Sequence, residues 1–406
     1  MLDRKTLEAM GGWKGYRIEK VEWPGEASRT LSVYLKSSAK TMRCAQCGGR
    51  CDQVHDTSVR RVRDLPIFQF RVVLHVPRRR VWCPRCNGPR LEQLDWLGRY
   101  QRVTNRFADA VEQLLGSANV QAVAAFFELG WHTVKAIDKS RLQARLQEPD
   151  WSSIRYLAMD EFALHKGHRY ATVVVEPLSR QVLWVGEGRS RETARQFFEQ
   201  LPAGVAERIE AVAIDMTTAY ELEIKAHCPQ AEVVFDLFHV VAKYGREVID
   251  RVRVDQANQL RGDRPARKVL KSSRWLLLGN AANLGHEQAV HLKELLAANE
   301  PLMCVYVMRD ALKRLWFYQR PAWAQRAWEQ WQEQAAQSNI PALQKFAQRL
   351  QGYWHGILAR CRHPLNTSIV EGINNTIKVI KRRAYGYRDT EYFFLKIRAA
   401  FPGIPR

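Results

Sequence analysis

The sequence predicts a multi-domain fold that combines an α/β domain with helical and cysteine-bearing modules. The chain has 406 residues, more than one compact core holds, and hydrophobic residues make up 46% of it. Strand-forming and helix-forming segments alternate over residues 150–240, and a stretch with helical spacing and few strand formers follows. We expect the domains to cover, in chain order, residues 1–98, 99–149, 150–240, 241–358 and 359–406. In the first, residues 30–35 alternate as a strand does. In the last, a Pro/Asn/Thr turn is expected to precede one amphipathic helix and a basic tail.

The charge of the chain indicates a polyanionic partner. Its formal net charge is +21 and its pI is about 9.8, and such an excess of like charge opposes compact folding. Nucleic acid is the commonest polyanion; a solvated basic surface and a binder of ribosomes or membrane surfaces are the alternatives. The chain has no apolar run long enough for a membrane span, and its N-terminus lacks the apolar core of a signal peptide. We therefore expect a cytoplasmic protein.

Two pairs of cysteines predict a zinc site. Cys44 and Cys47 form one C-x-x-C pair, Cys83 and Cys86 form another, and 35 residues separate them. Two thiolates at this spacing reach one ion from a tight turn, and two such turns complete the tetrahedral site that zinc accepts. We expect one structural zinc ion in a zinc ribbon, with a hairpin between the pairs that includes a strand at 68–76. The alternative is four buried or redox-active cysteines.

The segment from Arg60 to Arg106 is dense in arginine. It holds twelve arginines against three acidic residues, with aromatic residues between them. Arginine binds phosphate through a planar fork of donors, whereas a solvated surface more often mixes lysine with acidic residues. We therefore expect DNA contact here, and the candidate side chains are Arg60, Arg61, Arg78, Arg79 and Arg80.

Residues 104–146 fit a helix-turn-helix. The expected helices cover about Asn105 to Leu115, about Val120 to Leu129, and a third segment that begins near Thr133. The hydroxyl of Thr133 would cap the third helix, and the turn at Gly130 is one residue longer than the common pattern. A plain helical hairpin is the alternative. The candidate DNA contacts on the third helix are Lys135, Lys139 and Arg141.

The α/β region has the element order of an RNase-H-like domain: strand, strand, strand, helix, strand, helix, strand. The expected strands cover residues 154–159, 170–175, 181–185, 209–214 and 233–235. In that fold the first and fourth strands are neighbours. Asp160 and Asp215, which follow those two strands, would therefore converge.

An acidic cluster at this edge suits phosphodiester chemistry. Two hard cations about 4 Å apart activate the attacking oxygen and stabilise the leaving one, so we expect two Mg²⁺ or Mn²⁺ ions. Two aspartates are too few to hold both, and Glu371 is the third candidate. An apolar stripe that includes Val370 and Ile373 would pack its helix onto the sheet and leave Glu371 at the edge of the buried face. The same side of this helix carries Asn374, Asn375 and Lys378.

Alternatives to this assignment stay open. An acidic residue after a strand is often a helix cap or a surface group. Glu161 is adjacent to Asp160 and could take its place, although alternation along a strand points the two side chains to opposite faces. Asp236 and His239 either hold the metal-binding residues in place without binding metal themselves, or belong to a capped, packed turn.

Taken together, the motifs resemble those of a known family. The segments that carry the resemblance are Met159-Asp160-Glu161-Phe162, Ala213-Ile214-Asp215-Met216, Asp236-Leu237-Phe238-His239 and Glu371-Gly372-Ile373-Asn374-Asn375-Thr376-Ile377-Lys378. With the cysteine pairs and the helix-turn-helix before them, they resemble the DDE transposases of the bacterial ISL-three insertion-sequence family across nearly the whole chain. The C-terminal motif is the most specific part. The long hairpin between the cysteine pairs and the long turn at Gly130 depart slightly from the pattern.

The resemblance implies an RNase-H-like catalytic core interrupted by an all-helical insertion, with Asp160, Asp215 and Glu371 as its acidic triad. It implies recognition of terminal inverted repeats in double-stranded DNA, metal-dependent nicking, and transfer of the freed strand to target DNA. We expect at least a homodimer on DNA, associated with the bacterial nucleoid. The side chains expected to hold phosphates near the triad are Lys378, Lys381, Arg382 and Arg383.

Three other functions remain as alternatives. A DNA-binding regulator would share the N-terminal modules but would not need three acidic residues on a separate α/β core. A nuclease or resolvase of the same fold would cut DNA without joining strands. An inactive copy of the element is the third alternative, although no position of the triad is missing.

Overall fold

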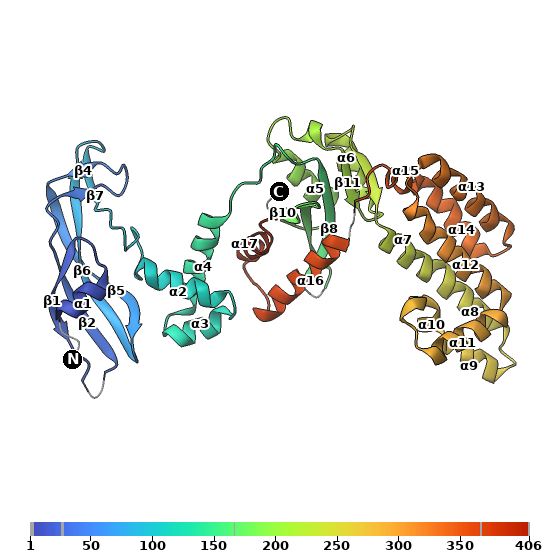
Figure 1. Ribbon diagram of the computed structural model, residues 1–406, viewed down its shortest axis with the longest axis horizontal. Helices are drawn as coiled ribbons and strands as arrows, with labels where there is room; N and C mark the ends of the chain where they lie inside the picture. The colour runs from blue at the N-terminus through green and yellow to red at the C-terminus, as the bar shows by residue number, and fades with distance from the viewer. Residues whose placement is uncertain (1–3, 26–27, 166, 366–367, 405–406) are drawn as a thin grey trace. The chain divides into compact units, whose positions relative to one another are not determined.

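The computed structural model describes residues 4–25, 28–165, 167–365 and 368–404. The chain divides into two compact units, Met1–Ala144 and Arg145–Arg406, called here the N-terminal and C-terminal units. Each unit is described by itself, and Figure 1 shows the elements of both. No helix in the described part of the chain is long and apolar enough to cross a membrane.

The N-terminal unit is built on a five-stranded sheet in the order β1-β2-β6-β5, with β7 paired to β6. Strands β2 and β6 run parallel, and the other pairs are antiparallel. The predicted hairpin between the cysteine pairs is present as β5 and β6. The elements are α1 (Arg4–Gly11), β1 (Tyr16–Glu22), β2 (Thr30–Ser37), β3 (Met42–Arg43), β4 (Arg50–Cys51), β5 (Val54–Ile67), β6 (Phe70–Cys83) and β7 (Gly88–Leu91).

Alternating side chains bury one face of this sheet. Leu31 and Val33 of β2 lie in one core with Leu74 and Val76 of β6, because residues two apart on a strand share a face. The hairpin therefore belongs to a larger sheet that includes the N-terminal strands, and it extends well beyond the predicted strand at 68–76.

Three helices complete the N-terminal unit: α2 (Asn105–Leu115), α3 (Val120–Phe127) and α4 (Trp131–Arg145). Thr104 and Asn119 cap the first two with side-chain oxygens, as is typical of helix starts. Helix α4 begins at Trp131, so the expectation that Thr133 caps it was wrong. The carbonyl of Gly130 accepts bonds from the amides of Thr133 and Val134, which places Thr133 inside the first turn.

The C-terminal unit contains a second five-stranded sheet in the order β10-β9-β8-β11-β12. Only β8–β11 and β11–β12 are parallel pairs. In chain order this arrangement is 3-2-1-4-5, so the first and fourth strands are neighbours, as an RNase-H-like fold requires. The strands are β8 (Tyr156–His165), β9 (Arg169–Glu176), β10 (Gln181–Glu187), β11 (Ala211–Ile214) and β12 (Glu232–Phe235).

Helices cover both faces of this sheet. Phe197 of α5 and Ile224 of α6 pack on the face that carries Leu157, while Ile373 of α16 and Phe393 of α17 pack on the opposite face. Figure 1 shows α16 and α17 together beside β8 and β10. The elements are α5 (Arg191–Glu199), η1 (Ala206–Arg208), α6 (Thr218–His227), α16 (Ser368–Arg383) and α17 (Thr390–Ala400).

Helix α17 corrects the prediction that a single helix and a basic tail close the chain. Tyr385 and Gly386 both adopt a positive φ, of 55° and 99°, and the amide of Gly386 donates to the carbonyl of Lys381, which ends the preceding helical segment. The carboxylate of Asp389 then accepts a bond from the amide of Tyr392 and starts α17. Phe393 and Ile397, one turn apart, are both buried against the sheet.

A helical region connects β12 to α16 and has its own core, in which Trp328 and Trp331 stack with ring centroids 5.6 Å apart. It touches the sheet where β12 ends, because the indole N–H of Trp316 donates to the carbonyl of Phe235 at 3.2 Å. The elements are α7 (Leu237–Tyr244), η2 (Gly245–Ile249), α8 (Asp250–Gln259), α9 (Arg264–Ser272), α10 (Arg274–Leu278), η3 (Ala281–Asn283), α11 (His286–Ala297), α12 (Glu300–Arg314), η4 (Leu315–Phe317), α13 (Pro321–Gln337), α14 (Pro341–Leu350), η5 (Gln351–Tyr353) and α15 (Trp354–Ala359).

Candidate active site and DNA-binding regions

Asp160 lies in the middle of β8, where the sequence predicted the end of a strand. The hairpin with β9 continues to His165, so β8 extends five residues past Asp160. The parallel pairing with β11 stops earlier, at Ala158 opposite Ala213. Asp160 therefore lies just beyond the point where the parallel pairing ends, and its backbone is held by β9 alone.

Strand register brings three aspartates to one level. Ala213 is opposite Ala158 and Ile214 is opposite Phe235. Extending the same registers by one or two residues places Asp215, just after β11, between Asp160 of β8 and Asp236, just after β12. The side chain of Asp160 shares a face with Ala158 and Phe162, which pack in the core under α16.

The carboxylate of Asp160 is oriented by one donor on each oxygen. The amide N–H of Glu161 donates to Oδ1 at 2.8 Å, and Nδ2 of Asn374 donates to Oδ2 at 2.7 Å. Burial raises the pKa of Asp160 to about 6, with a further increase from the charge of Asp215 and a decrease from His239. These electrostatic effects indicate that Asp160, Asp215 and His239 share one environment.

Helix α16 contacts Asp160 through Asn374, while Glu371 stays exposed one turn before it. Among the described residues, only four cysteines form a group of at least three metal-binding side chains with ligand atoms within 4.8 Å of one another. The structure thus brings Asp160 and Asp215 onto neighbouring strands and the helix of Glu371 against Asp160. It does not gather the three carboxylates within that distance.

Asp215 and Asp236 each have a local partner. The hydroxyl of Thr217 donates to Asp215, and the amide of Phe238 donates to Asp236 at 2.8 Å. Asp236 is thus the cap of α7 and also lies 3.8 Å from Nε2 of His239. Both alternatives for this pair, support of the site and a capped turn, fit the geometry.

Sequence reasoning missed several groups around this edge. Tyr220 of α6 donates to or accepts from the Thr172 hydroxyl at 2.8 Å, and burial raises its pKa, as do the charges of nearby acidic residues. Glu161 forms an ion pair with Arg189 at 3.1 Å, on the face of β8 opposite Asp160. Thr217, two residues after Asp215, is the one of these contacts that the local sequence could have predicted. The other contacts join segments that are distant along the chain.

The basic residues of α16 differ in their surroundings. Lys378 donates to the side chain of Asn375 at 3.2 Å, and Lys381 donates to the carbonyl of Ala163 at 3.1 Å. Arg382 and Arg383 are exposed near the end of the helix. Lys381 therefore helps to attach α16 to β8.

The four predicted zinc ligands form one cluster. Sγ of Cys44 lies 3.9 Å from Sγ of Cys86, and Sγ of Cys47 lies 3.5 Å from Sγ of Cys83. A hydrogen bond from the backbone amide of Cys86 lowers the pKa of Cys83 to about 6, whereas a hydrogen bond with Cys47 raises the pKa of Cys86 to about 12, so the thiolate is favoured at Cys83 first. Four sulfur ligands at this spacing fit a tetrahedral zinc ion.

Two of the five candidate arginines in the hairpin are buried, which corrects the expectation that they contact DNA. Arg78 is 1% exposed and donates to the carbonyl of Glu92 at 3.2 Å. Arg79 is 7% exposed and forms an ion pair with the Glu92 carboxylate. Both guanidinium groups therefore bond to Glu92 within the N-terminal unit. Arg61 and Arg80 are exposed, and Arg60 is partly exposed.

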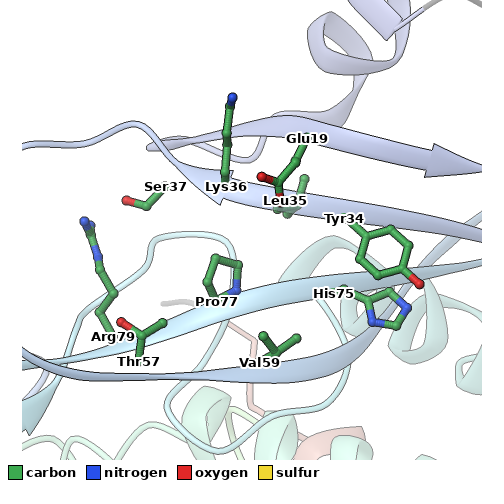
Figure 2. Close-up of a pocket in the computed structure, with 10 residues that line it drawn as sticks. All are labelled: Glu19, Tyr34, Leu35, Lys36, Ser37, Thr57, Val59, His75, Pro77 and Arg79. Carbon is green, nitrogen blue, oxygen red and sulfur yellow. The ribbon is translucent and has the colours of Figure 1, made fainter.

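In the N-terminal unit, the face of the sheet opposite to the core of Leu31 and Leu74 holds a pocket of about 320 Å³. Figure 2 shows the ring of Tyr34 beside that of His75, and the two rings stack at 4.1 Å between centroids. Lys36 lies along the rim and is exposed. The lining residues are Glu19, Tyr34, Leu35, Lys36, Ser37, Thr57, Val59, His75, Pro77 and Arg79. The pocket is distinct from the cysteine cluster and contains none of its residues.

On the helix-turn-helix, Val134 is fully buried in the core of the three helices and Ile137 packs against that core. Lys135 and Lys139 are partly exposed. Arg141 donates to the carboxylate of Asp109 on α2 at 2.6 Å, so its guanidinium also joins two helices of the unit.

The strand order of the C-terminal unit, with Asp160, Asp215 and Asp236 at one edge of its sheet, defines a protein of the RNase-H-like class that acts on nucleic acid. Family models identify it more closely. A model described as "Transposase" matches residues 157–397. A "Helix-turn-helix domain of transposase family ISL3" matches 92–142, and a "zinc-finger of transposase IS204/IS1001/IS1096/IS1165" matches 40–86. The chain belongs to the ISL3 family of DDE transposases.

Curated relatives agree with this assignment. The chain is 77% identical, over the full length of both proteins, to the "Transposase for insertion sequence element IS1001" of Bordetella parapertussis. It is 26% identical over 402 residues to the "Transposase for insertion sequence element IS1557" of Mycobacterium tuberculosis, which covers 92% of this chain and 90% of the relative. The protein is a transposase of an insertion sequence, with zinc-ribbon, helix-turn-helix and DDE domains in that order.

Proposed function

We propose that this transposase cuts and rejoins DNA at a divalent-cation site formed by Asp160, Asp215 and Glu371. The observation that supports the proposal most strongly is the parallel pairing of β8 with β11, since Asp160 and Asp215 both follow the last paired residues, and α16 is bonded to Asp160 through Asn374. Glu371 lies three residues before Asn374, which is about 4.5 Å along a helix axis. A side-chain rotation or a small shift of α16 brings its carboxylate towards the aspartates.

The donor set fits hard cations. Carboxylate oxygens are the ligands that Mg²⁺ and Mn²⁺ prefer, and Asp160 and Asp215 supply them. Bound there, two such ions would activate the attacking oxygen and stabilise the leaving oxygen of the phosphodiester. Thr217 and Asn374 hold Asp215 and Asp160 in fixed orientations through their hydrogen bonds, and His239 with Asp236 supports the same edge from β12 and α7.

The reaction proposed has two steps at this edge. Water attacks the phosphate at the end of the element and breaks the bond to the 3′ oxygen. The freed 3′ hydroxyl then attacks a phosphate of the target DNA, so one phosphodiester forms as another breaks and no external energy is needed. Exposed Lys378, Arg382 and Arg383 would hold the phosphates beside the site.

DNA recognition is assigned to the N-terminal unit. Exposed Arg61 and Arg80 of the hairpin, with Lys135 and Lys139 of α4, are the proposed contacts with the terminal inverted repeats. The four-cysteine cluster holds one structural zinc ion in this proposal. Joining two element ends requires at least two copies of the chain on DNA, and we place the protein in the bacterial cytoplasm with the nucleoid.

The test is strand transfer of a labelled element end into plasmid DNA with Mg²⁺. We expect Asp160→Asn, Asp215→Asn and Glu371→Gln each to reduce joining by at least about 100-fold, a loss of about 3 kcal/mol of transition-state stabilisation. DNA affinity, measured by fluorescence anisotropy, should stay unchanged. The matched control is Glu287→Gln, an exposed glutamate on α11.

Two results would contradict the proposal. If the Glu371→Gln variant still joins DNA strands, Glu371 is not part of the site, and Asp160 and Asp215 must bind the cations with another ligand. Nicking without joining by the wild-type chain would indicate a nuclease of the same fold.

A further inference from the structure

Asn374 is a buried amide with only one of its two polar atoms satisfied. The side chain is 7% exposed. Its Nδ2 donates to Oδ2 of Asp160 at 2.7 Å, whereas its Oδ1 is buried and has no hydrogen-bond partner among the described residues. Buried acceptors of this kind are rare in folded proteins, and water or an ion usually satisfies them.

Helix packing fixes this amide against Asp160. Ile373 and Ile377 on α16 are buried in the core of the sheet, and Lys381 donates to the carbonyl of Ala163 on β8. The helix is thus attached on both sides of Asn374. Rotating α16 to expose the amide would remove Ile373 and Ile377 from the core, so the unsatisfied oxygen follows from the packing of the helix.

The orientation of the amide follows from the chemistry of its partner. An ionised carboxylate only accepts hydrogen bonds, so Nδ2 must face Asp160 when that group is charged. Reversing the amide would place two acceptors together and leave two donors without partners. Oδ1 therefore makes no bond to the Asp160 carboxylate and is left for another group.

The adjacent asparagine shows the contrast. Asn375 is exposed, and its oxygen accepts a bond from Lys378 at 3.2 Å. Lys378 thus donates to the exposed amide of Asn375. The buried amide has an unsatisfied oxygen beside an ionisable carboxylate, which is the environment in which an amide oxygen binds a hard divalent cation.

We propose that Asn374 belongs to the cation site: Nδ2 positions Asp160, and Oδ1 is an additional oxygen ligand for the divalent cation that Asp160 binds. This inference rests on the function proposed above and adds a neutral ligand to its three carboxylates. It explains why α16 presents an amide at this position, since one side chain both orients the charged ligand and completes the set of oxygens.

The experiment measures Mn²⁺ binding to the full-length, zinc-loaded protein by electron paramagnetic resonance, without DNA and without turnover. Soft thiolates retain zinc in the presence of Mn²⁺. We expect Asn374→Leu to weaken Mn²⁺ binding by about 10-fold or more, the usual loss when a group that supports a metal site is removed. Asn375→Leu is the matched control and should bind Mn²⁺ as the wild type does.

Thermal melting with and without cation separates this role from a merely structural one. Leucine removes the unsatisfied oxygen but also the Nδ2 donor of Asp160, so these two effects on the melting temperature oppose each other without Mn²⁺. Added Mn²⁺ should raise the melting temperature of Asn374→Leu less than that of the wild type. Asn374→Asp retains an oxygen at the same place and should restore Mn²⁺ binding, which keeps the test decisive if the leucine variant fails to fold.

Two outcomes overturn the inference and can be told apart. If Asn374→Leu and Asn374→Asp both bind Mn²⁺ as the wild type does while Asp160→Asn loses it, the acidic site stands and Asn374 is not part of it. If Asp160→Asn also binds Mn²⁺ as the wild type does, the acidic site itself is wrong.

Discussion

Asp64 connects three segments of the N-terminal unit, and its removal should destabilise that unit strongly. This carboxylate on β5 is 0% exposed. It accepts bonds from the indole of Trp13 at 2.9 Å, the hydroxyl of Thr104 at 2.6 Å and Nε of Arg106 at 2.8 Å. Thr104 is also the cap of α2, so one buried acid joins the sheet to the helix-turn-helix.

The magnitude follows from what the substitution leaves behind. Asp64→Ala would leave the buried donors of Trp13 and Thr104 without an acceptor, whereas the side chain of Arg106 is 40% exposed and can be solvated. Each unpaired buried donor costs about 1–3 kcal/mol, so the loss is about 2–6 kcal/mol. At about 2–4 °C per kcal/mol for a domain of this size, the melting temperature should fall by about 4–24 °C. Asp56 is on the same strand but exposed, and its ion pair with Arg80 spans 3.0 Å. Asp56→Ala should cost at most about 1 kcal/mol.

Calorimetry of the full chain measures the two melting temperatures, and hydrogen exchange locates the change. Faster exchange in Asp64→Ala should appear at residues 60–67 and 104–115, where the network joins β5 to α2. Asp64→Asn retains an acceptor for Trp13 and should be intermediate. Equal melting of the Asp64→Ala and Asp56→Ala variants would refute the argument that the buried carboxylate joins the two parts.

Three further predictions concern other parts of the chain. Hydrogen bonding to Arg195 lowers the pKa of Glu223 from 4.5 to about 2, so its stabilisation is complete above pH 4.5 and is lost as pH falls towards 2; unfolding curves of Glu223→Gln should therefore differ from wild type at neutral pH and converge with it near pH 2. A Cβ on Gly356 would lie 2.4 Å from the ring of Phe235, so Gly356→Ala should detach α15 from β12 and speed hydrogen exchange there, whereas Gly352→Ala, with open space, should not. Chelation of zinc should unfold the four-cysteine region and weaken DNA binding, and added zinc should restore both; binding unchanged by complete zinc removal would contradict this.

Much of the fold was predictable because local pattern determines it. The alternation that predicted a strand at 30–35 and the strands of the α/β core is present because each of these strands packs at least one face into a core. The first helix of the helix-turn-helix agrees with the prediction at both ends, since Thr104 caps it and Leu115 is its last buried residue.

What the sequence did not predict depends on partners far along the chain. Arg78, Arg79 and Arg80 are consecutive and chemically alike, yet the first two are buried. Both of these bond to Glu92, on the segment that follows β7, whereas Arg80 pairs with Asp56. Asp160 was expected at a strand end because β8 was predicted from its apolar residues alone. The strand continues because β9 pairs with it, which no local pattern reveals.

Glu371 is an exposed residue on a helix that packs on the sheet. Its helix is fixed on the sheet by buried Ile373 and Ile377, so the backbone at Glu371 cannot move far. Asn366 and Thr367, in the turn expected before this helix, lie outside the described residues. The carboxylate is exposed, and three like charges repel one another without a cation between them. An acidic triad of this kind should therefore close only when cations bind, which makes the Mn²⁺ affinity of Glu371→Gln a direct measure of how far the side chain contributes.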